Sequence, residues 1–380
     1  FFCRYRLLFF FFCFSFFSFS QNNKKGSSFI DINYFKGYIP LHNSDILHLI
    51  EGRPGGALLA WNKRTYGLKK WQKLYNYPDY GVSMIFQDFE SDVLGVNYGV
   101  YGHFNFYFFR RHLMLRIAQG LIYASNPYSK INNPKNIAFG SRLLASPYLM
   151  LNYNKSNLIG PIGIQSGLLL FHASNGNFKA PNTSVNTISF IIGFNYDLDM
   201  QKLTIKNHPD EYFTKEKLKL NLVFRSGLNQ MSAVGSPQFP FYTFSAYLDK
   251  KINFFSAFQT GIEMFISMAL KEEIYYRSVA FPEEDSDQNA DYKRVGSFVG
   301  HELFINKWSI ISQLGYYIYY PYDFEGRFYN RLGLKYYFGD NWFGGFSVKS
   351  HSATAEAIEF GIGIRPVSYT HLTLPTKVEV

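Results

Sequence analysis

Apolar and polar residues alternate along most of the chain, in segments separated by Gly, Asn, Asp or Pro. The clearest segment is 94–108, in which the even positions are mostly apolar and the odd positions carry Gly, Asn, Tyr and His. Because successive side chains of a β-strand point to opposite faces, a period of two predicts strands with one apolar and one polar face. Residues 358–364 repeat the pattern, with Ile and Phe alternating against Glu and Gly.

This alternation predicts an all-β protein, an antiparallel transmembrane β-barrel of about 14 strands, within a range of roughly 12 to 16. Strands are expected near 81–90, 93–108, 112–124, 140–154, 159–173, 186–198, 215–227, 238–249, 252–269, 295–305, 307–320, 327–338, 341–351 and 355–365. The barrel would therefore occupy residues 81–366. Residues 21–80 alternate more weakly, so we expect them to precede the barrel or to line its mouth.

Connector lengths orient the predicted barrel, since bacterial barrels have short periplasmic turns and longer outer loops. Short turns near 109–111, 155–158, 250–251, 306 and 339–340 fall on one side of the sheet. Long connectors near 125–139, 174–185, 228–237 and 270–294 fall on the other side. The long polar connector 199–214 is an exception, because this scheme places it on the short-turn side. A further hairpin is the alternative at that point.

The two ends of the chain differ from the rest. In residues 1–20, Arg4 and Arg6 precede an apolar run that ends in Ser-Phe-Ser, which predicts a secretory signal peptide. Both cysteines, Cys3 and Cys13, lie in this segment, so we expect the mature chain to form no disulfide. Residues 367–380 break the strand pattern and look like translated sequencing-adapter sequence, so we exclude them from the fold.

Composition narrows the class of protein further. The chain has 41 Phe and 30 Tyr, yet no apolar run long enough for a spanning helix follows the predicted signal peptide. An exported, aromatic-rich protein built of strands favours a barrel in the bacterial outer membrane. The formal net charge of +10 would suit a partner that bears phosphates.

The segment Phe-His-Ala-Ser-Asn-Gly-Asn-Phe-Lys-Ala-Pro-Asn, residues 171–182, carries the candidate chemistry. Residues two apart on a strand share a face, so His172 and Ser174 can lie within hydrogen-bond reach of each other. Their even-numbered face also carries Ile164, Leu168 and Leu170, which predicts that the pair points toward lipid. A polar pair on a lipid face costs free energy, and a bilayer-embedded ester substrate would explain its presence.

This motif resembles that of the lipid A 3-O-deacylase family, which includes acyloxyacyl hydrolase-like barrels. The resemblance implies that His172 is the general base and Ser174 the nucleophile. It also implies that Asn175 and Asn182, with the nearby backbone of Gly176, stabilise the oxyanion. The stretches 61–82 and 326–363 also resemble longer members of the family, so the likeness extends over most of residues 35–365.

Asn186 is the main departure from the family pattern, which has an acid at the corresponding position, 14 residues after the histidine. An amide can orient the histidine but cannot offer a negative charge to the imidazolium. In a serine-protease triad, replacing the acid by its amide lowers turnover by about 10⁴. Glu356 has the right parity on the last predicted strand, but it is expected far around the barrel.

These observations lead to one main hypothesis and one rival. The main hypothesis is an outer-membrane serine esterase that removes an ester-linked acyl chain, at the 3-O position by family resemblance, from lipid A of lipopolysaccharide. It needs no metal or cofactor, and its partners are lipid A and the outer membrane rather than nucleic acid. The rival is a non-catalytic barrel, either a pore or a lipid-binding or structural protein. His301 and His351 stand in no metal-ligand spacing and are expected to be lumen or loop residues.

Overall fold

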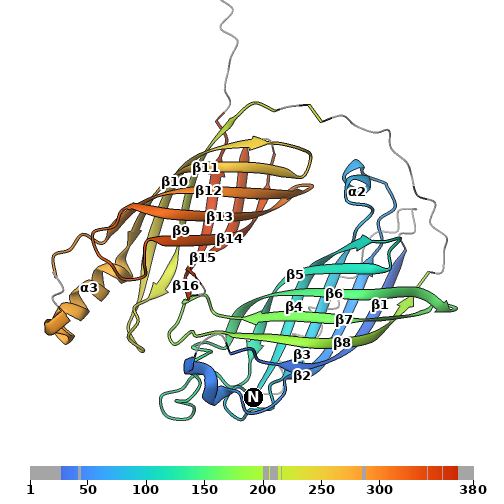
Figure 1. The fold of residues 1–380 in the computed structure, drawn as a ribbon, viewed down its shortest axis with the longest axis horizontal. Coiled ribbons are helices and arrows are strands. Elements are labelled where there is room, and N and C mark those ends of the chain that lie inside the picture. Colours follow the sequence, from blue (N-terminus) through green and yellow to red (C-terminus); the bar gives the residue numbers. More distant parts are fainter. Residues whose placement is uncertain are drawn as a thin grey trace, which may run out of the picture.

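The computed structural model describes residues 27–41, 44–199, 205, 213–214, 216–284, 288–339, 341–352 and 354–366. The predicted signal peptide at 1–20 and the excluded segment 367–380 lie outside these residues. Within the described residues the chain forms sixteen strands, arranged as two closed antiparallel barrels of eight strands each (Figure 1).

The first barrel, coloured blue to green in Figure 1, runs in sequence order from β1 to β8. It closes where β1 pairs with β8, from Phe29 opposite Asp197 to Tyr38 opposite Ile188. A 3-10 helix, η2 (Ser44–Leu49), and a short helix, α2 (Lys70–Leu74), lie in its connectors. Its strands are β1 (Ser28–Tyr38), β2 (Gly55–Lys63), β3 (Asp79–Asp88), β4 (Val96–Phe108), β5 (Leu113–Ala124), β6 (Leu143–Ile159), β7 (Ile162–Ala173) and β8 (Val185–Asp197).

The second barrel, coloured yellow to red, closes where β16 pairs with β9, from Phe360 opposite Ser226 to Ile364 opposite Leu222. The helix α3 (Met268–Ala280) extends from the end of β11 and is followed by η3 (Pro282–Glu284). The strands are β9 (Lys219–Gln230), β10 (Gln238–Lys251), β11 (Ser256–Ser267), β12 (Lys293–Ile305), β13 (Trp308–Tyr319), β14 (Phe328–Tyr337), β15 (Trp342–His351) and β16 (Thr354–Ile364).

The sixteen strands of the described residues fall within the predicted range of 12 to 16, but the structure corrects the prediction of a single barrel at residues 81–366. Each predicted strand overlaps an observed one, but β1 and β2 lie in the segment expected to precede the barrel. Their inner faces carry Phe35, Leu58 and Ala60, all buried, so apolar residues occupy both faces and the alternation is weak. Barrel closure depends on pairing between strands far apart in sequence, which local alternation does not encode.

The connector 199–214, which did not fit the predicted orientation, joins β8 of the first barrel to β9 of the second. A barrel with an even number of hairpin-connected strands begins and ends on the same side. In both barrels this is the side of the short turns, such as 109–112 and 160–161 in the first and 306–307 in the second. Because β8 ends and β9 begins on this side, the connector between the two barrels also lies there. Its position is explained without the further hairpin that the sequence left open.

Side chains fill both barrel interiors, as expected when only eight strands enclose them. In the first barrel Arg116 Nη2 lies 2.7 Å from Asp31 Oδ2, and both side chains are fully buried. In the second barrel Arg331 forms ion pairs with Glu263 and Glu359, again with no exposed side chain among the three. The pore hypothesis relied on a strand count large enough for an open lumen. The two small, charge-packed barrels remove that basis.

The outer faces of the strands are apolar. On β8, Phe190, Ile192 and Phe194 are 58%, 55% and 64% exposed, while the residues between them point inward. Phe258 and Ile262 are similarly exposed on β11. A band of exposed apolar side chains around strands of 9 to 17 residues is the pattern of a barrel with a lipid-facing surface. Among the described residues, no helix has the length and apolar character needed to cross a membrane.

Candidate functional site

The hairpin of β7 and β8 places the predicted site residues at the long-loop end of the first barrel, in two hydrogen-bonded groups: His172 with Asn186, and Ser174 with Asn175, Gly176 and Asn182. His172 on β7 lies directly opposite Asn186 on β8 in the strand register. Ser174 follows the end of β7 and forms a bridge with Ala145, through two backbone hydrogen bonds of 2.8 and 3.2 Å. His172 and Asn186 have even numbers in strands whose even positions point outward, so both belong to the outer face.

The amide of Asn186 sets the orientation of the His172 ring. The two side chains are joined by a hydrogen bond of 2.7 Å between His172 Nδ1 and Asn186 Oδ1. An amide oxygen can only accept, so Nδ1 carries a proton, and in the neutral ring Nε2 keeps its lone pair. This is the tautomer that a histidine base requires. A hydrogen bond from Ser146 Oγ to the His172 backbone oxygen, 2.7 Å long, further fixes this end of β7.

Ser174 lies in a compact network with the asparagines that follow it. Its hydroxyl donates to Asn182 Oδ1 at 3.1 Å, and the same oxygen accepts from the Asn175 backbone N–H at 2.9 Å. The Gly176 backbone N–H donates to Ser174 Oγ at 3.0 Å. Ser174 and Asn175 are only 6% and 2% exposed. One backbone donor, the Gly176 N–H, and the Asn182 side chain thus contact the serine oxygen in a nearly dry environment.

Glu356, the acidic residue that the sequence offered as a substitute for the missing acid, is not a free carboxylate. Its side chain is buried in the second barrel, where it forms ion pairs with Arg294 and Lys349. Gln230, which the sequence analysis did not single out, contacts the loop that carries the site. No local motif marks this residue, because the contact joins positions 50 residues apart.

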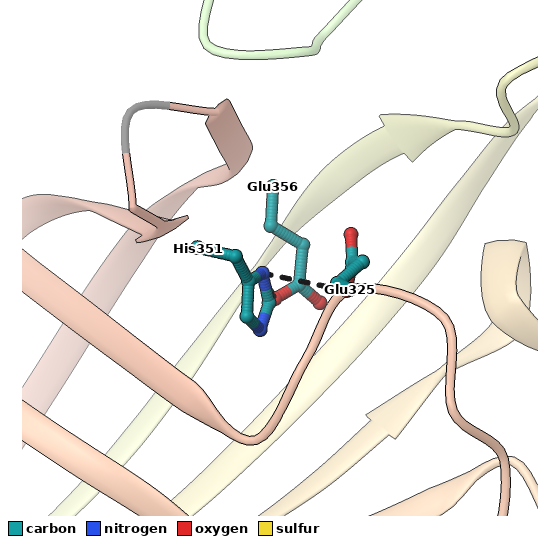
Figure 2. Close-up of side chains that lie close together, drawn as sticks. All are labelled: Glu325, His351 and Glu356. Atoms are coloured by element: carbon teal, nitrogen blue, oxygen red, sulfur yellow. Dashed lines mark ion pairs between the residues drawn. The ribbon is translucent and has the colours of Figure 1, made fainter.

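A second cluster of polar side chains lies inside the second barrel. Figure 2 shows Glu325, His351 and Glu356 converging, with potential ligand atoms within 4.8 Å of one another. Three such groups can bind a divalent cation. Here, however, both carboxylates already form ion pairs with Arg294, and Lys349 pairs with Glu356 as well. Two buried cations therefore already neutralise the carboxylates, and we assign the cluster a structural role.

The fold and the site together define a class: a double β-barrel protein that carries, at the rim of one barrel, the residue types used by serine hydrolases. The sequence profile of the family described as "Lipid A 3-O-deacylase (PagL)" matches residues 55–195. The profile described as "Acyloxyacyl hydrolase, C-terminal domain" matches residues 218–369. The two matches correspond closely to the two barrels, and the chain belongs to the lipid A 3-O-deacylase family. This confirms the resemblance found in the sequence.

Similar solved structures include porins and other outer-membrane proteins, but the likeness is weak. A mutant of the Rhodopseudomonas blastica porin has 9% identity and a TM-score of 0.18, covering 90% of this chain and all of that one. The Acinetobacter baumannii protein Omp33 gives the same identity, TM-score and coverage. At these TM-scores neither bears on fold or function. No curated protein matches the sequence.

Proposed function

We propose that this protein is an outer-membrane esterase that removes an ester-linked acyl chain from lipid A, at the 3-O position that the family name specifies. The observation that carries the proposal is the hydrogen bond between His172 and Asn186, with Ser174 two residues along the same hairpin. It supplies an oriented base on the strand that leads to Ser174, in a chain of a deacylase family.

In the proposed mechanism His172 Nε2 accepts the proton of Ser174 while the serine oxygen attacks the acyl carbonyl carbon. The carbonyl oxygen becomes an oxyanion, which the N–H groups of Asn175 and Gly176 and the amide of Asn182 stabilise. The ester C–O bond then breaks, and His172 returns the proton to the sugar oxygen that leaves. A water molecule, deprotonated by His172, then attacks the acyl carbon, the bond to Ser174 Oγ breaks, and His172 returns the proton to Ser174 as the fatty acid leaves.

The position of the site suits a substrate that is itself part of the membrane. His172 and Asn186 are on the outer face of the barrel, beside the exposed apolar side chains of β7 and β8. Long connectors at this end, such as 125–142 and 174–184, indicate the extracellular side, where lipopolysaccharide forms the outer leaflet. Lipid A can then reach the site by lateral diffusion, with its acyl chains beside the barrel and its ester bonds at the rim.

The test is incubation of the refolded protein with purified lipopolysaccharide, followed by mass spectrometry of the lipid A. We expect the loss of one hydroxyacyl chain with the parent protein and no loss with Ser174→Ala. Ser166→Ala is the matched control, because Ser166 lies on the same strand outside the site, and it should keep full activity. Equal activity of parent and Ser174→Ala would refute the proposed nucleophile.

A further inference from the structure

The loop that carries the site, residues 174–182, lies against the second barrel. The Ala180 backbone N–H donates to Gln230 Oε1 at 2.6 Å, and the Gln230 backbone N–H donates to the Asn177 oxygen at 3.4 Å. The Gln230 side chain also donates to the backbone oxygen of Ser236 and is 8% exposed. One buried glutamine at the end of β9 thus joins the site loop of the first barrel to the β9–β10 connector of the second.

Further contacts from the second barrel hold the same loop. Asn177 Nδ2 donates to the Glu356 backbone oxygen at 3.3 Å, and Gln238 Nε2 donates to the Phe178 oxygen at 2.7 Å. Gly176 adopts a φ of +61°, and a Cβ at this position would lie 2.3 Å from Ile358 Cγ1. Three strands of the second barrel, β9, β10 and β16, therefore contact the loop between its ends.

This contact matters because both ends of the loop belong to the proposed oxyanion site. Asn175 and Gly176 lie at its start and Asn182 at its end. Hydrogen bonds around Ser174 and Asn182 join the two ends, and two further hydrogen bonds lie within the loop. One joins Asn175 Nδ2 to the Lys179 oxygen at 2.6 Å, and another joins the Phe178 N–H to the Asn175 oxygen at 3.2 Å. Oxyanion donors must be placed to within about 0.5 Å, and a misplacement of about 1 Å can cost about 100-fold in rate.

We infer that the second barrel is a working part of the active site, and that Gln230 is a positioning residue that holds the 174–182 loop in its catalytic shape. The inference rests on the proposed deacylase function. The second barrel then does more than anchor the protein in the membrane. The hydrogen bonds that hold the middle of the 174–182 loop come from its strands β9, β10 and β16. In this role Gln230 acts through the loop that it holds.

Three variants of the full chain test the inference. Gln230→Met keeps the size of the side chain but removes the acceptor for the Ala180 N–H, so kcat on lipopolysaccharide should fall about three- to tenfold, with KM little changed. Gln230→Glu keeps an acceptor oxygen and should recover most of the activity. Gln288→Met is the matched control, since Gln288 is exposed in the β11–β12 connector.

A second readout follows the loop directly, independently of turnover. Lys179 is exposed within the loop, so the rate of tryptic cleavage after it, followed by mass spectrometry, reports how firmly the loop is held. We expect faster cleavage in Gln230→Met and an unchanged rate in Gln288→Met. Gln238→Ala, an exposed change that leaves the buried glutamine intact, should also accelerate cleavage, by a smaller factor.

The outcomes separate this inference from the proposed function. A parent protein that releases no acyl chain refutes the proposed function, whatever the state of the loop. An active parent whose Gln230→Met variant matches it in kcat refutes only the positioning role. An unchanged cleavage rate after Lys179 in Gln230→Met also overturns the inference, because the loop is then held without the glutamine. Slower turnover together with faster cleavage supports it.

Discussion

The most informative perturbation is Asn186→Asp, which replaces the amide by a carboxylate of the same size. Asn186 Oδ1 already accepts from His172 Nδ1 at 2.7 Å, so the ring orientation and tautomer should be retained. The variant adds a negative charge beside the imidazolium that, in the mechanism we propose, forms when His172 accepts the serine proton. We therefore expect turnover to rise.

The size of the rise follows from the geometry. A contact of 2.7 Å between nitrogen and oxygen places the charge centres about 4 Å apart, where an effective dielectric constant of about 20 gives about 4 kcal/mol. Both side chains are partly exposed, so screening reduces this to about 2 kcal/mol. That corresponds to about a 30-fold increase in kcat. The increase is smaller than the cost of about 10⁴ in the serine-protease example, in which the amide also imposes the wrong tautomer.

The assay is the initial rate of fatty-acid release from saturating lipopolysaccharide, quantified by mass spectrometry. Asn132→Asp is the matched control, because it makes the same chemical change in an exposed connector of the first barrel. Asn186→Leu, which removes the acceptor, should lower kcat. If folded Asn186→Asp is no faster than the parent, or if Asn186→Leu is as active as the parent, Asn186 does not orient the base.

Three further predictions concern the barrels. Arg116→Met leaves the buried Asp31 carboxylate without its cation and should lower the free energy of unfolding by about 3–5 kcal/mol, measured by urea titration. Burial, followed by repulsion from a neighbouring carboxylate, raises the pKa of Glu325 from 4.5 to about 7. The folded protein then holds this proton more tightly than the unfolded chain, so the free energy of unfolding should fall as pH rises from about 4.5 to about 7. The midpoint of urea unfolding should show this fall in the parent protein and should lack it in Glu325→Gln. Phe190→Arg, on the outer face of β8, should destabilise the protein in lipid by about 2–4 kcal/mol. Ile131→Arg, in an exposed connector, should leave the stability unchanged, and equal effects of the two substitutions would contradict a lipid-facing β8.

Periodicity alone predicted the all-β fold, because exposed apolar residues alternate with inward-facing residues along the predicted strands. It missed β1 and β2, whose inner faces carry Phe35 and Leu58. It could not divide the strands between two barrels, since the closing pairs β1–β8 and β16–β9 join distant segments. The helix α3, in the connector expected at 270–294, was also missed, because its apolar residues form no strong pattern of their own.

The site was more accessible to sequence reasoning than the barrel count. The alternation of inward and outward positions along the two strands predicted that His172 and Asn186 share the outer face. The strand register makes them direct partners. Parity could not predict which atoms meet or that Asn182 accepts from the Ser174 hydroxyl. The contact with Gln230 joins two barrels across 50 residues, so only the three-dimensional structure reveals it.

We propose that this double barrel deacylates lipid A in the outer membrane with Ser174 as the nucleophile. The mass spectrum of lipid A recovered from Gram-negative cells that express the protein tests this reaction in the membrane itself. We predict that lipid A from cells making the parent lacks one hydroxyacyl chain, and that lipid A from cells making Ser174→Ala is unchanged. Intact lipid A in cells whose outer membrane contains the folded parent would contradict the account.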